Sequence, residues 1–456
     1  MCSFSRLFCV SALPLLVNCQ SVHTWDDGRE WGEPEFIGIQ ALDTKFVDIA
    51  MDASGDAVVV WTARHVSEGP EDIWSNRYSA EEGASWSTPE PIPIEGPNAL
   101  FPRVAVDREG NATVVWNQSR GTRLDIWSNR YTRDGGWGDP EPIEEIDDTG
   151  DAQRPEVAMD AKGNAVAVWY QDDGTYSNIL SNRYTPGIGW GDPEPIEKIE
   201  GDARSPQVAV DPDGNAFAVW QQLDRDRDSI DTRSNIWSNR YMPGVGWGTQ
   251  LPLETDDTGD AIRPRVAVDA DGNAIAVWQQ SDAALRFDIW SNRYTPSDGW
   301  GGRELIEFED AGDATKPRVA MDPDGNAVAV WSQFDGTSDD IWSNRYTSRG
   351  HWAGPERIET NDTGSAVSPR VVMDANGSAV ALWTQPDGAQ LSIWSNRYTG
   401  SLGWGAAEVI EFFDRSRVWQ AEVAIDAGGN AIAVWAQRVG ANDELWSSRL
   451  AERVLE

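Results

Sequence analysis

Histidine and cysteine are almost absent from this 456-residue chain. The three cysteines all lie within the first 19 residues, so no disulfide framework supports the rest of the chain. The three histidines stand at positions 23, 65 and 351, without an HExxH motif, a Ser-His-Asp order or a P-loop. We therefore do not expect histidine-based catalysis or metal-activated hydrolysis. A catalytic carboxylate pair stays open, because glycosidases need only two acids.

Positive charge is also scarce. Lys and Arg together number 37 against 75 Asp and Glu, which gives a net charge of -38. Such a surface repels nucleic acid and anionic membranes and attracts cations. We therefore expect no nucleic-acid partner, and the charge favours solubility over a dedicated cation-binding role.

Long apolar runs are missing as well, and no segment is long enough to span a bilayer. Residues 1–19 place Arg6 before a short apolar stretch from Leu7 to Val17, which is typical of an export signal. Cleavage after Cys19 would give a secreted protein, the favoured reading. Alternatively, LVNC resembles a bacterial lipobox with Cys19 as the lipidated residue, which would anchor the protein to the cell envelope. Both readings predict a location outside the cytoplasm.

Two short strings of residues recur along the whole sequence. IWSNRY occurs unchanged at 73–78, 126–131, 236–241, 289–294, 341–346 and 393–398. A second string, VAVDADGNAIAVW at 266–278, recurs in phase with it. Its first Asp occurs eight times, as Asp52, Asp107, Asp160, Asp211, Asp269, Asp322, Asp374 and Asp426. Eight copies at a period of about 50 residues indicate a solenoid, a propeller or an array.

Each copy divides into four strand-length runs separated by turns rich in Gly, Pro and Asp. In residues 264–307 these runs are PRVAVD, NAIAVWQQ, DIWSNRYT and WGGRELIE. The second run alternates small and bulky apolar residues, so both of its faces are apolar, as stacked sheets require. Four strands per copy at this spacing are typical of a propeller blade.

The two ends of the chain predict that the ring closes. The last copy stops at ELWSSRL, 444–450, after its third strand, whereas REWGEPEFI, 29–37, is a fourth strand without a blade. If 29–37 completes the last blade, no sheet edge stays exposed. We therefore predict an all-β fold, a closed β-propeller of eight four-stranded blades over residues 29–450. A short segment, 20–28, precedes it and a tail, 451–456, follows it.

The strings D-x-x-G-N-A…W, IWSNRY and GWG cover essentially the whole chain after the signal. They resemble the repeats of exported bacterial β-propeller proteins, and the resemblance implies that fold. Sialidase-like and lectin-type propellers are similar in architecture. The resemblance transfers no sugar-binding residue, because no lectin signature matches.

The arginines of IWSNRY repeat identically around the predicted ring, so they cannot converge on one point. We expect them to fasten strands by binding a neighbouring Asp or backbone carbonyls. A unique ligand site needs departures from the consensus, and by strand count the most variable loops share one face. The candidate ligand-binding residues on this loop face are Tyr170, Tyr176, Asp224, Asp226, Asp228 and Trp419. Exposed Tyr and Trp suit sugar stacking or protein contact.

Acidic linkers join successive blades, for example IDDTGDA at 146–152 and TDDTGDA at 255–261. Their candidate metal ligands are Asp147, Asp148, Asp151, Asp256, Asp257 and Asp260. Clustered carboxylates could capture Ca²⁺. The favoured reading, for these linkers and for the DxDG turns, is that the acids bond backbone amides of their own turns. Calcium is the one cofactor to consider.

These observations predict a binding or scaffold module, monomeric, that recognises a glycan or a protein through its loop face. A carbohydrate-active enzyme of propeller fold, a glycoside hydrolase or lyase, is one alternative. A structural repeat protein of the envelope is another.

Overall fold

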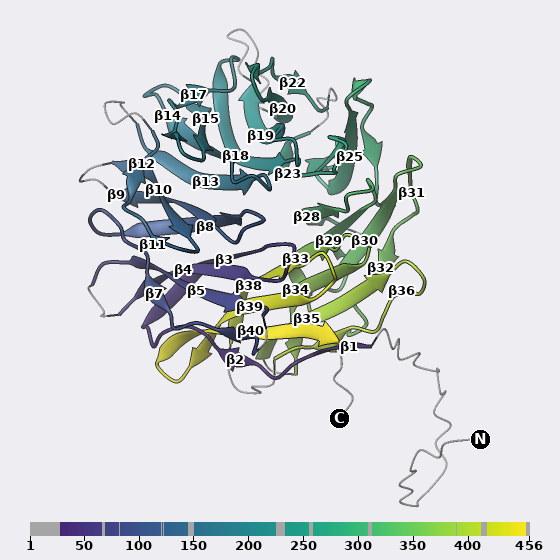
Figure 1. Cartoon of the computed structure of the whole chain (residues 1–456). Coiled ribbons are helices and arrows are strands. Elements are labelled where there is room, and N and C mark those ends of the chain that lie inside the picture. The colour runs from purple at the N-terminus through teal and green to yellow at the C-terminus, as the bar shows by residue number, and fades with distance from the viewer. Residues whose placement is uncertain are drawn as a thin grey trace, which may run out of the picture.

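The computed structural model describes residues 28–65, 69–81, 83–119, 121, 123–144, 150–224, 233–254, 259–308, 312–388, 390–411 and 417–452. Over these ranges the chain is all β, and its strands form eight sheets arranged in a ring (Figure 1). The predicted eight-bladed propeller is confirmed. The same ranges contain no helix, and accordingly none that is long and apolar enough to cross a membrane.

The first strand of each blade lies nearest the axis and contacts the first strands of its neighbours (Figure 1). In blade order these strands are β3 (Asp43–Met51), β8 (Ala99–Val106), β13 (Ala152–Met159), β18 (Gly201–Val210), β23 (Ala261–Val268), β28 (Ala314–Met321), β33 (Val367–Met373) and β38 (Val418–Ile425). The second strands are β4 (Ala57–Arg64), β9 (Ala112–Ser119), β14 (Ala165–Asp172), β19 (Ala216–Asp224), β24 (Ala274–Ser281), β29 (Ala327–Phe334), β34 (Ala379–Asp387) and β39 (Ala431–Val439).

The third strands carry the IWSNRY string. They are β5 (Asp72–Ser79), β10 (Leu124–Thr132), β15 (Ser177–Thr185), β20 (Ser234–Met242), β25 (Phe287–Thr295), β30 (Asp339–Thr347), β35 (Gln390–Thr399) and β40 (Asn442–Glu452). Each pairs with its second strand in antiparallel register, for example Trp342 opposite Trp331.

The fourth strand of each blade is split into two short pieces, both paired with the third strand. In blades one to seven they are β6 and β7 (Ser85–Trp86, Glu90–Pro91), β11 and β12 (Gly136–Trp137, Glu141–Pro142), β16 and β17 (Gly189–Trp190, Glu194–Pro195), β21 and β22 (Gly246–Trp247, Leu251–Pro252), β26 and β27 (Gly299–Trp300, Glu304–Leu305), β31 and β32 (His351–Trp352, Glu356–Arg357), and β36 and β37 (Gly403–Trp404, Glu408–Val409). The sequence predicts one continuous run here. Glycine and proline residues between the two pieces weaken the ladder, since proline has no N–H to donate.

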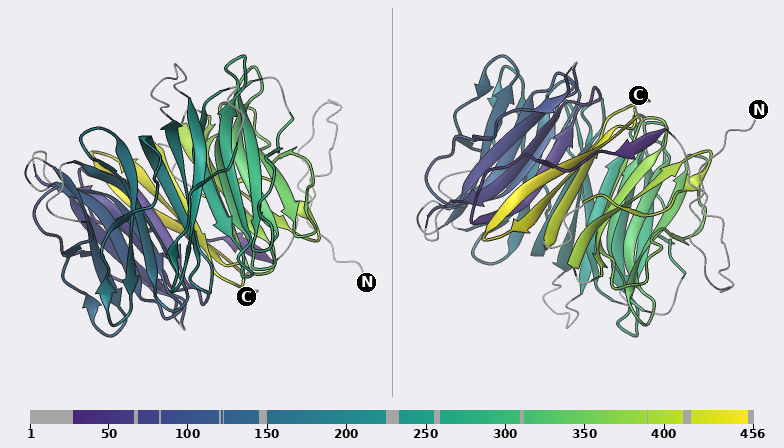
Figure 2. Two further views of the ribbon diagram at one scale, coloured as in Figure 1. Left: turned by 90° about the horizontal axis from the view of Figure 1, so that it is seen from above. Right: turned by 90° about the horizontal axis from the view of Figure 1, so that it is seen from below.

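The ring closes through the N-terminal strand, as predicted. β1 (Arg29–Trp31) and β2 (Glu35–Phe36) pair with β40 and complete the eighth blade. Figure 2 shows this purple segment alongside the yellow C-terminal strands. Trp31 lies opposite Leu450, and its indole Nε1 donates to Ser395 Oγ of blade seven at 3.2 Å. The edge of β40 is therefore covered.

The core lies between the blades. The recurrent tryptophan inside each second strand is fully buried, and most of these tryptophans donate to the glutamine two residues on, as Trp331 Nε1 does to Gln333 Oε1 at 2.8 Å. This pairing satisfies a donor that would otherwise be buried without a partner. The bulky apolar residues of one blade pack against those of the next, which buries both faces of every sheet.

The IWSNRY string makes contacts between neighbouring blades. Asn344 Nδ2 donates to Ile306 O of the preceding blade at 2.8 Å. Ser291 Oγ accepts a hydrogen bond from Trp352 Nε1 of the following blade at 3.0 Å. The arginine stacks on the tyrosine of the following blade in the pairs Arg77–Tyr131, Arg130–Tyr184, Arg183–Tyr241, Arg240–Tyr294, Arg293–Tyr346, Arg345–Tyr398 and Arg449–Tyr78. The arginines do join strands, but the recurrent partner is the tyrosine ring of the next blade; the predicted Asp and carbonyl partners are seen at Arg130, which contacts Asp107 and Gly163 O.

Candidate ligand site at the propeller axis

Every first strand carries a β-bulge at the same position, where its register with the second strand shifts. One residue in each bulge has a φ between 53° and 60°, in the left-handed region that non-glycine residues rarely adopt. We call these residues the mouth ring: Phe46, Phe101, Arg154, Ser205, Arg263, Lys316, Ser368 and Gln420. Bulges re-aim side chains, and strain of this kind concentrates at functional sites.

Two residues further along each strand lies a second ring. We call it the axial ring: Asp48, Arg103, Glu156, Gln207, Arg265, Arg318, Arg370 and Glu422. Arg370 of blade seven binds Glu422 of blade eight through two contacts of 2.6 Å. Arg103 Nε lies 3.2 Å from Glu156 Oε2, and Gln207 Nε2 donates to Glu156 Oε1 at 3.0 Å. Polar contacts therefore link neighbouring blades around much of the axis.

The axial side chains of non-adjacent blades influence one another electrostatically. Arg318 on blade six and Arg103 on blade two lie across the ring from each other, yet Arg103 contributes to lowering the pKa of Arg318. Two charges on opposite blades influence each other this much only when little water lies between them. The side chains still keep accessible surface, 18% for Glu422 and 34% for Arg103. The axial ring thus lies deep in the molecule while remaining in contact with solvent.

Asp48 is the most perturbed acid of this ring. Burial raises its pKa to about 7, and the nearby Glu422 adds to the shift, although Arg103 opposes it. Its Oδ2 accepts the backbone N–H of Val104 at 2.9 Å. A carboxyl group that titrates near neutrality can give or take a proton under physiological conditions.

The mouth ring forms an aromatic platform on blades one and two. The ring centroids of Phe46 and Phe101 lie 3.9 Å apart, and the guanidinium carbon of Arg154 lies 4.3 Å from the Phe101 centroid. On the other side, Gln420 Oε1 accepts the Phe46 N–H at 2.6 Å. Both phenylalanines keep part of their surface accessible. Lys45 Nζ lies 5.6 Å from the Phe46 centroid, so the stacked, partly accessible rings are flanked by cations and a hydrogen-bonding amide.

The predicted loop residues do not come together in one site. Tyr170 on β14 donates to Gln153 Oε1 at 3.0 Å and lines a cavity of about 520 Å³ with Asp172 and Arg204. Tyr176 lines a separate cavity of about 420 Å³. Trp419 on β38 is half-buried against the core shared by blades eight and one, beside Gln420. Asp224 ends β19, and Asp226 and Asp228 lie outside the described residues.

The predicted acidic linkers hold backbone amides where they are described. Asp151 Oδ1 accepts the Leu124 N–H at 2.9 Å, and Asp260 Oδ1 accepts the Ser234 N–H at 2.9 Å. Each bond ties a linker to the third strand before it. The other predicted metal ligands and the lipidation candidate lie outside the described residues: Asp147, Asp148, Asp256, Asp257 and Cys19. Calcium binding and lipidation therefore stay predictions.

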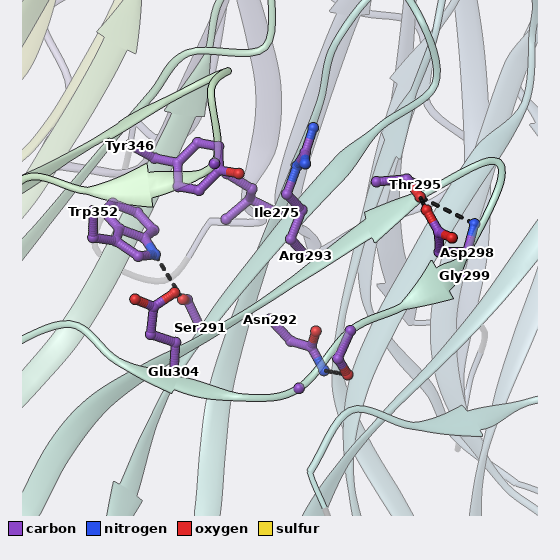
Figure 3. A pocket seen from close by; sticks show the side chains of 13 residues that line it. Ile275, Ser291, Asn292, Arg293, Thr295, Asp298, Gly299, Glu304, Tyr346 and Trp352 are labelled. Atoms are coloured by element: carbon purple, nitrogen blue, oxygen red, sulfur yellow. Dashed lines mark hydrogen bonds between the residues drawn. The ribbon is translucent and has the colours of Figure 1, made fainter.

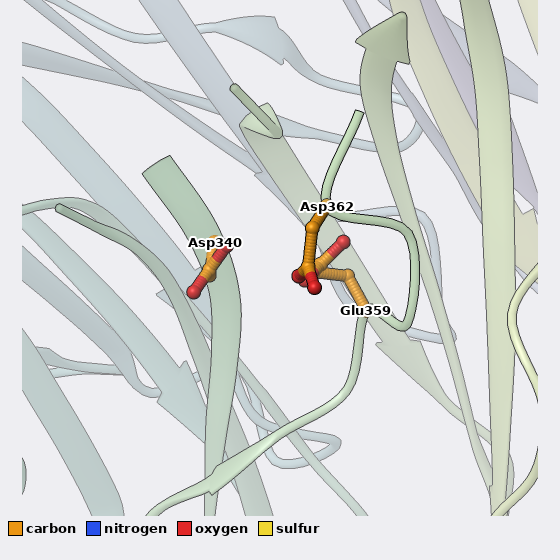
Figure 4. A group of neighbouring side chains, drawn as sticks. All are labelled: Asp340, Glu359 and Asp362. Atoms are coloured by element: carbon orange, nitrogen blue, oxygen red, sulfur yellow. The ribbon is translucent and has the colours of Figure 1, made fainter. Parts of the chain in front are cut away.

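A different group of three acids comes close enough to hold a metal ion: Asp340, Glu359 and Asp362 (Figure 4). Arg357 already occupies this position, with its Nη1 at 3.5 Å from Asp340 Oδ2, 3.6 Å from Glu359 Oε1 and 3.0 Å from Asp362 Oδ1. Burial and the neighbouring Glu359 raise the pKa of Asp340 to about 6. The guanidinium supplies the positive charge that a metal would otherwise bring.

Grooves between neighbouring blades are lined by residues that recur in every repeat. One of about 280 Å³ between blades five and six is lined by Arg293, Tyr346 and Trp352 (Figure 3). Its counterpart between blades one and two is lined by Arg77 and Tyr131. Since consensus residues build both, neither is unique in the way that the axial site is.

The sequence matches no protein family and no curated protein. Among solved structures it is similar to an ulvan lyase of a new polysaccharide lyase family, with a TM-score of 0.52 and 10% identity over 82% of this chain and 95% of that chain. The lyase bound to -[GlcA(1-4)Rha3S]- gives a TM-score of 0.53 and 10% identity over 83% and 96%. A protein of unknown function from Dyadobacter fermentans gives a TM-score of 0.45 and 12% identity over 94% and 100%. At these identities the comparisons show the propeller fold alone.

Neither ring was found from the sequence. Both lie inside regular strands, where the apolar pattern predicts core residues and gives no indication of a site. A usable signal exists, however. When the eight copies are aligned on the PRV string, the arginine position holds Asp, Arg, Glu or Gln, whereas the next position is valine in seven copies and Ile49 in the first.

Proposed function

We propose that this protein is an exported propeller that binds a glycan at the mouth of its axis. The observation that carries the proposal is the stacked pair Phe46 and Phe101. Arg154 lies against the Phe101 ring, and Gln420 accepts the Phe46 N–H. Aromatic faces pack against the C–H faces of sugars, and the flanking amide and guanidinium suit their hydroxyl groups. The other mouth-ring positions hold no aromatic residue, so the platform occurs once per molecule.

Two further observations support a glycan. The N-terminal 19 residues have the features of an export signal, which would place the protein where extracellular polysaccharides occur. A polysaccharide lyase shares the fold. Each is consistent with the proposal, and the platform is what locates the site.

A glycan array followed by titration calorimetry tests the proposal. Phe46→Ala and Phe101→Ala should each weaken binding of the best glycan at least tenfold, which corresponds to about 1.4 kcal/mol. Phe308→Ala is the matched control, because Phe308 is an exposed phenylalanine in a linker. Equal affinity in all three variants would place the ligand away from the axis.

Asp48 favours a second candidate, a glycan-active hydrolase or lyase. Its pKa of about 7 suits a general acid or base, and the axial acids Glu156 and Glu422 are near enough to raise that pKa. Sugar release and absorbance of unsaturated products, measured on the glycans that bind, would detect such an activity. If the wild type cleaves a glycan and Asp48→Asn abolishes that cleavage, the enzyme proposal replaces the binding proposal.

A further inference from the structure

Two adjacent blades, five and six, present positive charge at both rings. Arg263 and Arg265 belong to β23, and Lys316 and Arg318 belong to β28. At the mouth ring the two cations are Arg263 and Lys316, and at the axial ring they are Arg265 and Arg318. Four cations side by side are unexpected in a chain with a net charge of -38.

The other charged members of the axial ring have partners of opposite sign. Arg370 binds Glu422, and Arg103 binds Glu156. In contrast, Arg265 Nη1 donates only to Pro264 O at 2.9 Å, and Arg318 Nη1 only to Pro317 O at 3.3 Å. Within the described part of the chain, none of the four cations forms an ion pair.

The electrostatics agree with this geometry. Burial lowers the pKa of Arg265 to about 10 and that of Arg318 well below its ordinary value. Neighbouring arginines contribute to both shifts. Glu422 opposes both, and Glu156 opposes that of Arg265, from a distance and without forming an ion pair with either arginine. Burial and the adjacent Arg263 lower the pKa of Lys316. Guanidinium groups held close together without counterions are unfavourable, and a bound anion would relieve the repulsion.

We propose that Arg263, Arg265, Lys316 and Arg318 form an oxyanion site for a carboxylate or sulfate group carried by the glycan. Guanidinium groups match the planar or tetrahedral oxygens of such groups with paired N–H donors. In an eight-bladed ring, blades five and six lie across from blades one and two, which carry Phe46 and Phe101. One sugar residue would stack on the platform while its acidic group, or that of its neighbour, reaches the cations. This inference rests on the proposed function for the glycan, but the oxyanion site can be tested without any glycan.

The first experiment uses inorganic sulfate as the probe. Thermal unfolding of the full chain is followed in sodium sulfate and in sodium chloride of equal ionic strength. Sulfate should raise the Tm of the wild type more than it raises that of the double variant R265Q/R318Q. R108Q/R349Q is the matched control, because it removes the same charge from two exposed turns. An equal effect of sulfate in all three proteins would overturn the oxyanion site.

The second experiment compares an acidic oligosaccharide with the same compound after reduction of its carboxylates to alcohols. The acidic form should bind at least tenfold more tightly to the wild type, and R265Q/R318Q should remove that preference. Equal affinity for the two forms would overturn this inference and leave the glycan-binding proposal standing. A sulfate effect specific to the arginines with no glycan bound would support the oxyanion site and count against the proposed function.

Discussion

The guanidinium carbon of Arg293 on blade five lies 5.5 Å from the ring centroid of Tyr346 on blade six. The same residue pair joins six other blade junctions. A propeller depends on contacts between blades, because each blade buries its apolar faces only against its neighbours. The repeated arginine therefore adds electrostatic attraction to a junction that also holds apolar packing and hydrogen bonds such as that from Trp352 to Ser291.

Removing one such contact should weaken the ring by a modest amount. We expect Arg293→Met to lower the free energy of unfolding by about 1 kcal/mol, since partly exposed cation–π contacts contribute about 0.5–2 kcal/mol. Urea denaturation followed by tryptophan fluorescence measures the difference. Arg108→Met, in an exposed hairpin turn, is the control. If both variants lose the same stability, the stacking has no measurable effect.

The N-terminal strand should be essential to the closed ring. Deletion of residues 1–37 removes Trp31 and Ile37 from the core and exposes the edge of β40. We expect a loss of about 3 kcal/mol or more, because burial of each large apolar side chain contributes about 1.5–3 kcal/mol. The open edge should also promote association, visible by size-exclusion chromatography. Deletion of residues 1–27, which spares β1, is the control and should leave both properties unchanged.

The stability of the protein should depend on the protonation of Asp48. Its pKa is about 7 in the folded protein against an ordinary 3.8, so the folded state binds the proton more tightly than the unfolded state. The contribution of Asp48 to the free energy of unfolding therefore falls as pH rises from about 4 to 7, and stays low above pH 7. The charged groups facing it are Arg103 on β8, Glu156 on β13, Glu422 on β38 and Arg370 on β33.

Asp48→Asn removes this titration and keeps an oxygen for the Val104 N–H. Between pH 5 and pH 8 we expect the Tm of the variant to fall less than that of the wild type. The difference corresponds to about 1–2 kcal/mol in the free energy of unfolding. This is below the full value of the pKa shift, because the side chain keeps 20% of its surface exposed. Asp134→Asn on an exposed turn is the control. Parallel pH profiles for Asp48→Asn and the wild type would contradict the assignment.

Arg357 should act as an internal counterion for Asp340, Glu359 and Asp362. We expect Arg357→Gln to destabilise the protein at neutral pH, because three neighbouring carboxylates lose their only bound cation among the described residues. Adding about 5 mM Ca²⁺ should then raise the Tm of this variant more than that of the wild type. Arg349→Gln, in an exposed turn, is the control. A calcium effect of the same size in the wild type would show that an ion already binds elsewhere.

The strands, the number of blades and the closure were all predictable from the sequence. Buried tryptophans and turn-forming Asp and Gly recur with the blade, so local signals report the same structure eight times. The complementary partial repeats at 29–37 and 444–450 added the one long-range pairing that the repeat leaves open. The split of the fourth strand was missed, because a two-residue piece has too little pattern to be distinguished from a turn.

The choice of candidate site was less successful, for a physical reason. Tyr170 and Tyr176 are unusual letters close together in the chain, yet the structure directs them into separate cavities. The axial residues are about 50 positions apart, and their surroundings in the sequence are ordinary strands. Only the packing of the blades into a ring brings them within range of one another.

The sequence by itself determined the blade, because apolar alternation, turn residues and the fastening string act over short distances along the chain. Tertiary structure decided which variable residues meet. The bulge of each first strand turns one side chain toward the mouth, and the ring collects eight such side chains from distant parts of the chain. Arg265 and Arg318 are ordinary letters in two strands of the sequence, and only at the axis do they become neighbouring cations that form no ion pair among the described residues.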